Sequence, residues 1–215
     1  MKNGNEMASD VLPLRSWDSY LASHVASTTT PAFAAIGPEL DRIAGRLAGI
    51  LSAGGRILVA GNGGSASDAN HIVGELVAAF AYERPALDVI SLCSNSTILT
   101  AWSNDFDVDT VFSRQVEAHL RPSDALILLS TSGESANIVQ AAMSGIRQGG
   151  YVLGLTGGQA SSLSQLCTDV IQAPSTFTPT VQECHVVVYH YLCAAIERAY
   201  VQSSGGELAA RYGPS

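Results

Sequence analysis

Five short apolar stretches set the expected architecture of this 215-residue chain. Each is rich in branched residues, ends at a Gly or Ser cluster, and is followed by a helical pattern or the tail. Their hydrophobicity is continuous rather than alternating, which is typical of strands covered on both faces in a parallel sheet. We therefore expect an α/β fold, a three-layer sandwich around a five-stranded parallel sheet, with strands at 57–60, 87–92, 125–130, 151–156 and 169–173.

Helical periodicity fills the segments between these strands and also precedes them. An N-terminal helix pair is expected at 14–26 and 32–51, before any strand. Residues 1–13 and 201–215 are polar and contain glycine, so we expect loose ends around a single domain at 14–200. The remaining helices are predicted at 66–80, 97–103 running into 110–120, 136–148, 160–166 and 180–200.

Charge and cysteine usage narrow the class of partner. The formal charge is −8, with 11 basic against 19 acidic residues and no basic run, which disfavours binding to nucleic acid or an anionic membrane. No CxxC pair, apolar leader or membrane-length span occurs, so we expect a cytoplasmic protein in a reducing compartment. The cysteines are Cys93, Cys167, Cys184 and Cys193.

The polar loops after the first and third strands are the expected ligand sites, because ligands bind where strand order reverses at the carboxyl edge of such sheets. The first loop, GNGGSASDANH, opens a helix whose N-terminal amides attract anions. Its spacing matches neither a dinucleotide fingerprint nor an NTP-binding loop. It predicts a phosphate cradle, and a strand-to-helix turn without a ligand remains the alternative.

The second loop, STSGES, also directly precedes a predicted helix. Hydroxyls next to fresh helix amides can surround one phosphate without Arg or Lys, which suits an acidic protein. In the alternative reading, Ser132 or Ser135 merely caps the helix. The hydroxyls belong to Ser130, Thr131, Ser132 and Ser135.

A possible metal or proton-transfer group begins with His71 and Glu75, which share one helix face at a spacing of four. A lone histidine on a helix is more often structural. The pair gains weight because the last predicted helix carries further ligand-type side chains, of which Glu183 could simply complement the helix N-terminus. These are Gln182, Glu183, His185 and His190.

The order of these motifs resembles the phosphoheptose isomerases of the sugar isomerase (SIS) domain superfamily over residues 32–200. The resemblance also includes SNDF at 103–106, VFSRQVEA at 111–118, LTGG at 155–158 and the QE-x-H-x4-H run ending at His190. Related superfamily members that assist bacterial replication initiation lack the paired His and Glu and the final His. Retention of these residues favours catalysis.

The resemblance implies an aldose-ketose isomerase of sedoheptulose 7-phosphate, built as a homotetramer with active sites between subunits. It implies zinc bound by His71, Glu75, Gln182 and His190, with Glu75 and His190 linked to proton transfer. Substrate contacts would map onto Asn62, Gly63, Gly64, Ser65, Glu75, Asn104, Asp105, Ser130, Thr131, Ser132, Ser135 and Gln182.

The chemistry agrees with this assignment but sets two limits. Exchange of the carbonyl between C1 and C2 needs a base, an acid and a positive or protic group near the oxygens. A side chain ligated to zinc is a poor free base. On a straight helix Gln182 and His190 lie about 12 Å apart along the axis and are turned by about 80° from each other. Both can therefore reach one ion only if their side chains lean together, or if the helix is irregular at its start beside Pro179.

Three positions depart from the usual isomerase pattern: Ala79 and Thr180 stand where Arg is common, and Glu134 replaces Asn. All three changes weaken simple attraction of an anion. Two alternatives therefore stay open, an isomerase of another long-chain sugar phosphate such as an octulose 8-phosphate, and a non-catalytic sugar-phosphate-binding scaffold. We expect His24 and His119 at the surface, whereas His185 is either structural or lines a neighbouring subunit's site.

Overall fold

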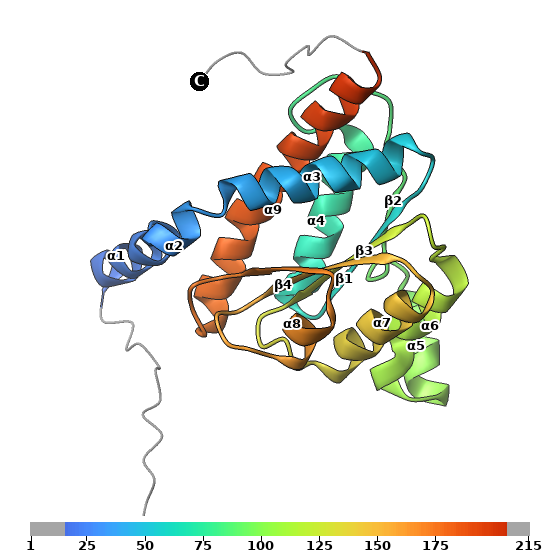
Figure 1. The fold of residues 1–215 in the computed structure, drawn as a ribbon. Helices are drawn as coiled ribbons and strands as arrows, with labels where there is room; N and C mark the ends of the chain where they lie inside the picture. The colour runs from blue at the N-terminus through green and yellow to red at the C-terminus, as the bar shows by residue number, and fades with distance from the viewer. Residues whose placement is uncertain (1–15, 206–215) are drawn as a thin grey trace, which may run out of the picture.

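The computed structural model describes residues 16–205, and its helices cover both faces of a central sheet (Figure 1). From Ser16 onward, three helices precede the first strand: α1 (Trp17–Thr28), α2 (Pro31–Ala34) and α3 (Gly37–Ser52). The rest of the chain alternates strands and helices. In order these are β1 (Ile57–Gly61), α4 (Gly64–Ala78), β2 (Val89–Ser91), α5 (Ser96–Asp105), the 3-10 turn η1 (Val108–Thr110), α6 (Val111–His119), β3 (Ala125–Ser130), α7 (Ala136–Arg147), β4 (Tyr151–Thr156), α8 (Ser162–Leu166), β5 (Asp169–Gln172) and α9 (Thr178–Ser203).

The five-stranded parallel sheet is confirmed, with the strand order β2-β1-β3-β4-β5. Alternate residues of each strand enter different cores, which explains the continuous hydrophobicity in the sequence. In β1, Ile57 and Val59 join the core beneath α3, α4 and α9, whereas Leu58 and Ala60 join the core beneath α6, α7 and α8. The result is the expected three-layer sandwich.

The strand order reverses between β1 and β3. From β1 the chain crosses to β2 at one edge, and from β3 it proceeds through β4 to β5 at the other. The two strands are in register from Ile57 opposite Ala125 to Gly61 opposite Leu129. Their following loops therefore leave the sheet side by side at its carboxyl edge, where a ligand site is expected.

The N-terminal helix pair differs from the prediction at one point. The segment 32–51 forms two helices rather than one, because α3 starts afresh at Gly37 with Pro38 in its first turn. Proline lacks an amide hydrogen and fits that position, but it cannot continue a preceding helix. Helix α1 begins after Ser16, whose hydroxyl accepts a hydrogen bond from the Ser19 amide.

The C-terminal helix is longer than predicted. Helix α9 continues through Ser203, so residues 201–203 are helical and not part of a loose tail. Val201 is buried, and its burial stabilises this last turn. Residues 1–13 and 206–215, predicted as loose ends, lie outside the described residues.

The connection after α4 is held by a buried ion pair. Arg84 donates to Glu197 at 2.7 Å, and both side chains are fully buried. Glu197 also accepts hydrogen bonds from the backbone amides of Phe80, Ala81 and Tyr82. These bonds replace helical ones, so α4 stops at Ala78 rather than at the predicted residue 80.

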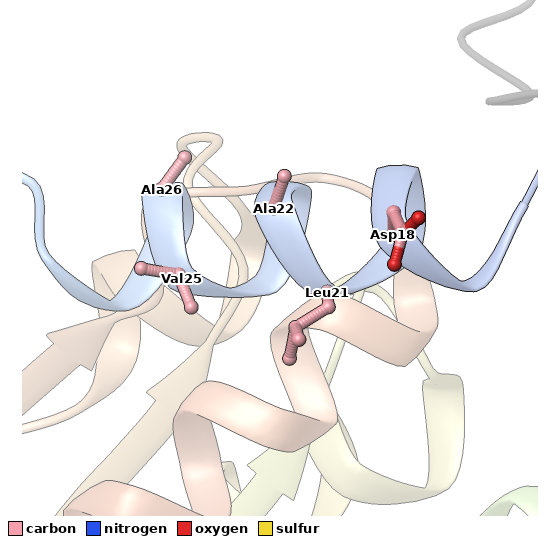
Figure 2. Close-up of a pocket in the computed structure, with 5 residues that line it drawn as sticks. All are labelled: Asp18, Leu21, Ala22, Val25 and Ala26. Atoms are coloured by element: carbon pink, nitrogen blue, oxygen red, sulfur yellow. The ribbon is translucent and has the colours of Figure 1, made fainter.

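Helix α1 stands apart from the sandwich, and none of its residues is buried (Figure 1). Its connection to α9 runs through Glu183, which accepts a hydrogen bond from the Tyr20 hydroxyl and contacts His24 Nδ1 at 2.7 Å. Leu21 and Val25 remain exposed along a shallow hollow, and Figure 2 shows Ala22 and Ala26 on the other side of the helix from Leu21. Between Ser16 and Gly205, no helix has the length and apolarity needed to cross a membrane.

Candidate active site

The loops after β1 and β3 enclose one polar cavity of about 270 Å³, which we call the cradle. Helix α9 closes it with its first two turns, so three segments distant in the sequence meet there. No Lys or Arg lines the cavity. Its lining residues are Asn62, Gly63, Gly64, Ser65, Leu129, Ser130, Thr131, Ser135, Thr178 and Gln182.

Two glycines let the first loop adopt its shape. Gly63 has φ of +55°, a conformation that side chains disfavour. At Gly64 a Cβ atom would collide with the side-chain amide of Gln182, so a larger residue there would force that amide to move. The positive end of α4 therefore lies directly at the cradle, where it favours an anion.

The hydroxyls of the second loop are divided between the cradle and the loop itself. The Ser135 hydroxyl makes no capping bond to α7 and lines the cavity, which excludes the capping alternative for this residue. The Ser132 hydroxyl instead accepts from the Glu134 amide at 3.2 Å, and Ser132 is exposed outside the cavity lining. Ser130 accepts from the Gly133 amide at 3.1 Å and shapes the turn.

Sequence reasoning missed two polar residues here, Thr178 in the cradle lining and Asn137 beside it. Asn137 exchanges reciprocal side-chain hydrogen bonds of 2.8 and 3.0 Å with Asn62, which ties the first loop to α7. Thr178 lines the cavity from the first residue of α9. Neither carries a local signal, because their roles depend on which segments the sheet brings together.

Two of the three departures from the isomerase pattern have a local explanation. Glu134 accepts hydrogen bonds from the Ser162 amide and hydroxyl at 2.8 and 2.6 Å, and these bonds hold the pKa of its carboxyl below the usual value. Its negative charge is thus engaged at the start of α8. Thr180 is buried in the first turn of α9, where its methyl and hydroxyl pack instead of a charge.

A second group, formed by His71, Glu75 and His190, brings ligand atoms within 4.8 Å of one another, and we call it the His-Glu-His cluster. His71 Nε2 lies 2.9 Å from Glu75 Oε1 across one turn of α4. His190 comes from α9, and its ring meets that of His71 edge to face at 5.0 Å. Imidazole and carboxylate ligands of this kind suit zinc.

The cluster has one buried neighbour, Tyr189, and two half-buried ones, Asp68 and Phe80, that the sequence did not reveal. The Tyr189 hydroxyl lies 3.0 Å from His71 Nδ1 and donates to Asp68 Oδ1 at 3.5 Å. Burial raises the pKa of the Tyr189 hydroxyl, so it keeps its proton, and burial also raises the pKa of Asp68. The ring of Phe80 stacks on His190 at 5.6 Å from the other side.

Three other predicted site residues lie outside the His-Glu-His cluster as defined above, one of them at the cradle and two in a different hollow. Gln182 lies at the cradle on a continuous α9, so its predicted place among the zinc ligands still requires its side chain to lean toward His190. Asn104 and Asp105 are exposed at the end of α5, where they line a different hollow with Ser96, Thr97 and Thr100. They do not reach the cradle of their own chain.

The remaining histidines have distinct environments. His185 is buried, and its Nε2 donates to the Thr156 carbonyl at 3.2 Å, which supports the structural alternative. Burial lowers the pKa of His185 to about 4. His119 is exposed as predicted, whereas His24 is half-buried against Glu183 rather than free at the surface.

The family model of the SIS domain matches residues 22–157. The parallel sheet, with its cradle where the strand order reverses, agrees with this match. The chain is therefore an SIS domain protein. It is 43% identical over 162 residues to the phosphoheptose isomerase of Rhodospirillum rubrum, covering 75% of this chain and 86% of that protein. It is 45% identical over 184 residues to that of Streptomyces coelicolor, covering 83% and 78%. The chain belongs to the phosphoheptose isomerase family, whose members are aldose-ketose isomerases.

The solved structures agree with this assignment. A phosphoheptose isomerase from Francisella tularensis superposes with a TM-score of 0.80 at 32% identity, covering 84% of this chain and 96% of that chain. The corresponding enzyme from Neisseria gonorrhoeae gives a TM-score of 0.78 at 30% identity over the same shares. Fold and sequence therefore point to one family.

Proposed function

We propose that this protein interconverts sedoheptulose 7-phosphate and D-glycero-D-manno-heptose 7-phosphate. The observation that carries the proposal is the meeting of Glu75 and His190 in one cluster on the two helices that also border the cradle. One helix supplies a carboxylate and the other an imidazole. This pair is able to remove a proton from one sugar carbon and to return one to its neighbour.

The spacing of the two groups favours a long substrate. His71 lies seven residues beyond Gly64 on α4, and His190 lies eight beyond Gln182 on α9, so both helices rise about 10–12 Å from the cradle to the cluster. An open seven-carbon chain with a terminal phosphate has this length. The phosphate would occupy the cradle, and C1 and C2 would lie at the cluster.

In the cradle, the hydroxyls of Ser130, Thr131 and Ser135 would donate to the phosphate oxygens, and the start of α4 would stabilise their charge. At the other end, Glu75 and His190 would move the proton between C1 and C2 through an enediol or enediolate. The Phe80 ring stacks on one face of the His190 imidazole and would help to hold it in place for this transfer.

We further propose that His71, Glu75 and His190 hold one zinc ion, to which Gln182 is added as a ligand only if its side-chain amide moves from Gly64 toward His190. The ligand atoms already lie within 4.8 Å, close to the spacing of about 3–3.5 Å around a tetrahedral zinc ion. A bound zinc ion would polarise the sugar carbonyl and stabilise the developing negative charge. Among residues 16–205, no cysteine belongs to the group of ligand atoms within 4.8 Å of one another, and the four thiols are free.

The proposed assembly is a homotetramer of one SIS domain per chain, with active sites between subunits. Asn104 and Asp105 support it, because they lie outside the cradle of their own chain and would complete that of a partner. The four free cysteines support a reducing compartment, for which we propose the cytoplasm. A sugar phosphate is the only partner besides further copies of the chain that this proposal requires.

The absence of two arginines that are common in the family supports a second candidate substrate. The half-buried Ala79 and the buried Thr180 leave no Arg at positions where the family commonly has one, so selection of the sugar rests on shape and hydroxyl contacts. This favours an isomerase of another long-chain sugar phosphate, such as an octulose 8-phosphate, as the alternative. A sugar-phosphate-binding scaffold without turnover is the remaining alternative.

Turnover in deuterated water separates these readings. We expect sedoheptulose 7-phosphate to exchange a C1 hydrogen with solvent and to give an aldose that carries deuterium at C2. Glu75→Gln should lower kcat by at least about 100-fold, because the base or ligand is lost. The measurement is NMR of a panel of seven- and eight-carbon ketose phosphates, with and without chelator.

The matched control for this test is Glu117→Gln, a conservative change at an exposed carboxylate on α6. It should leave turnover unchanged. Faster turnover of the eight-carbon sugar would replace the heptose assignment. Binding of either sugar without any exchange would reject an enzyme and leave the scaffold.

A further inference from the structure

The Tyr189 hydroxyl is the buried group that joins the His-Glu-His cluster to a second carboxylate. It lies 3.0 Å from His71 Nδ1 and donates to Asp68 Oδ1 at 3.5 Å. Tyr189 is only 2% exposed, so water does not compete freely for these contacts. Asp68 and His71 lie on one face of α4, and Tyr189 reaches them from α9.

The donors and acceptors in the series Asp68, Tyr189 and His71 determine where each proton lies. A carboxylate only accepts hydrogen bonds, so the Tyr189 proton is directed to Asp68. The hydroxyl oxygen is then free to accept a bond from Nδ1–H of His71. With its proton on Nδ1, the ring has a lone pair on Nε2, which lies 2.9 Å from Glu75 Oε1. Two acceptors at this distance are stable together only when a cation lies between them, so this tautomer fits a metal-bound state. That is the form of imidazole that binds a metal ion.

We infer that Tyr189 is a positioning residue, which with Asp68 fixes the ring orientation and tautomer of His71 so that Nε2 is presented to a divalent metal ion. This inference rests on the proposed function, since it concerns the zinc site proposed there. The role differs from a ligand's, because Tyr189 acts only through His71.

The ring of Tyr189 adds to this effect. It meets the His71 ring edge to face at 5.4 Å and the His190 ring at 4.8 Å, so it packs against both imidazoles of the cluster. Removal of the hydroxyl alone would retain these ring contacts. Its removal would take the hydroxyl partner away from both His71 Nδ1 and Asp68 Oδ1. The other carboxylate oxygen of Asp68, Oδ2, is already buried without a hydrogen-bond partner within residues 16–205.

The test uses Tyr189→Phe in the full chain, stripped of metal and titrated with Zn²⁺ against a chelating dye. We expect zinc affinity to fall about 10- to 100-fold, the usual effect of losing the outer partner of a metal-bound histidine. Substitution by Co²⁺ should show an altered absorption spectrum, a signal that simple loss of packing would not produce. The variant should also turn over more slowly, with a larger change in kcat than in KM, because the substitution leaves the cradle unchanged.

The matched control is Tyr191→Phe. Tyr191 lies on the same helix and also donates its hydroxyl to a carboxylate, Asp41 at 2.8 Å, but away from the cluster. The zinc affinity of the Tyr191→Phe variant should stay within twofold of the wild-type affinity. If Tyr189→Phe does not fold, Asp68→Asn supplies the second variant, because it removes the carboxylate charge that holds the tyrosine proton and should also weaken zinc.

The outcomes distinguish this inference from the proposed function. A wild-type protein that binds no zinc would overturn the proposed metal site, and the inference with it. A wild-type protein that binds zinc, together with Tyr189→Phe and Asp68→Asn that bind it equally well and give the same cobalt spectrum, would overturn the inference alone.

Discussion

His185 shows how burial alone sets the chemistry of a residue. It lies on α9 against the end of β4, donates to the Thr156 carbonyl, and has a buried Nδ1 without a hydrogen-bond partner among the described residues. A charged imidazole would have to lose its hydration there, so the neutral form is favoured and the pKa falls to about 4. The residue therefore connects the sheet to α9 as an uncharged donor.

This shift predicts a pH dependence of stability. The unfolded chain binds the proton with a pKa of about 6.5, so between pH 6.5 and 4 the unfolded state carries more protons than the folded state. His185 should thus favour folding fully above pH 6.5 and cost about 2 kcal/mol at pH 5. His185→Gln, which keeps a donor, should lose this dependence. Urea unfolding at pH 7 and 5 measures it, and an equal loss in both proteins would contradict it.

At the scale of elements, Glu197 determines where α4 ends and how the chain turns beyond it. It binds three successive backbone amides and Arg84, and this fixes the connection in which Phe80 stacks on His190. Ala79, at the junction, has φ of +131°, a strained conformation for a residue with a side chain. The strain persists because the bonds to Glu197 over-determine the turn.

Loss of Glu197 should therefore be costly. Glu197→Ala leaves the buried Arg84 guanidinium without its carboxylate and should lower the free energy of unfolding by about 3–5 kcal/mol. Glu117→Ala, whose ion pairs are exposed and 3.8–3.9 Å long, should cost less than about 0.5 kcal/mol. Guanidinium unfolding compares the two. Similar costs would show that the buried pair does not hold the connection.

At the scale of the whole molecule, two surfaces are exposed in the single chain. Helix α1 projects from the sandwich (Figure 1), and its side chains Trp17, Leu21 and Val25 are exposed. Asn104 and Asp105 line a hollow apart from the cradle. Both features agree with the proposed assembly, in which helix packing joins subunits and one chain completes the site of another.

Mixed assemblies test this arrangement. Glu75→Gln and Asp105→Ala should each be inactive alone, whereas co-expression in equal amounts should restore up to about one quarter of the activity, since a site built from two chains is then intact with that frequency. The control mixes Glu75→Gln with His190→Ala, both in the cluster of one chain, and should restore nothing. Absence of recovery in the first mixture would place Asp105 outside a shared site.

Much of the fold was predictable from local patterns. Strands β3 and β4 occupy the expected residues, because burial on both faces demands continuous apolar side chains. The i, i+4 spacing placed His71 beside Glu75, and the glycines marked the turn into α4. The break before α3 was missed, because the apolar period continues across it while Pro38 interrupts the backbone.

Residue types and periodicity report the local backbone and which faces are buried, and for this protein they determined the layered sheet, the two polar loops and the His-Glu pair. Only the packing of α9 against α4 decided that His190 joins that pair, that Tyr189 and Asp68 support it, and that Gln182 borders the cradle. Glu134 at α8 and Glu197 at the amides after α4 were decided in the same way. The physical reason is that these contacts join segments far apart in the chain, whose distance depends on how whole side-chain surfaces fit together.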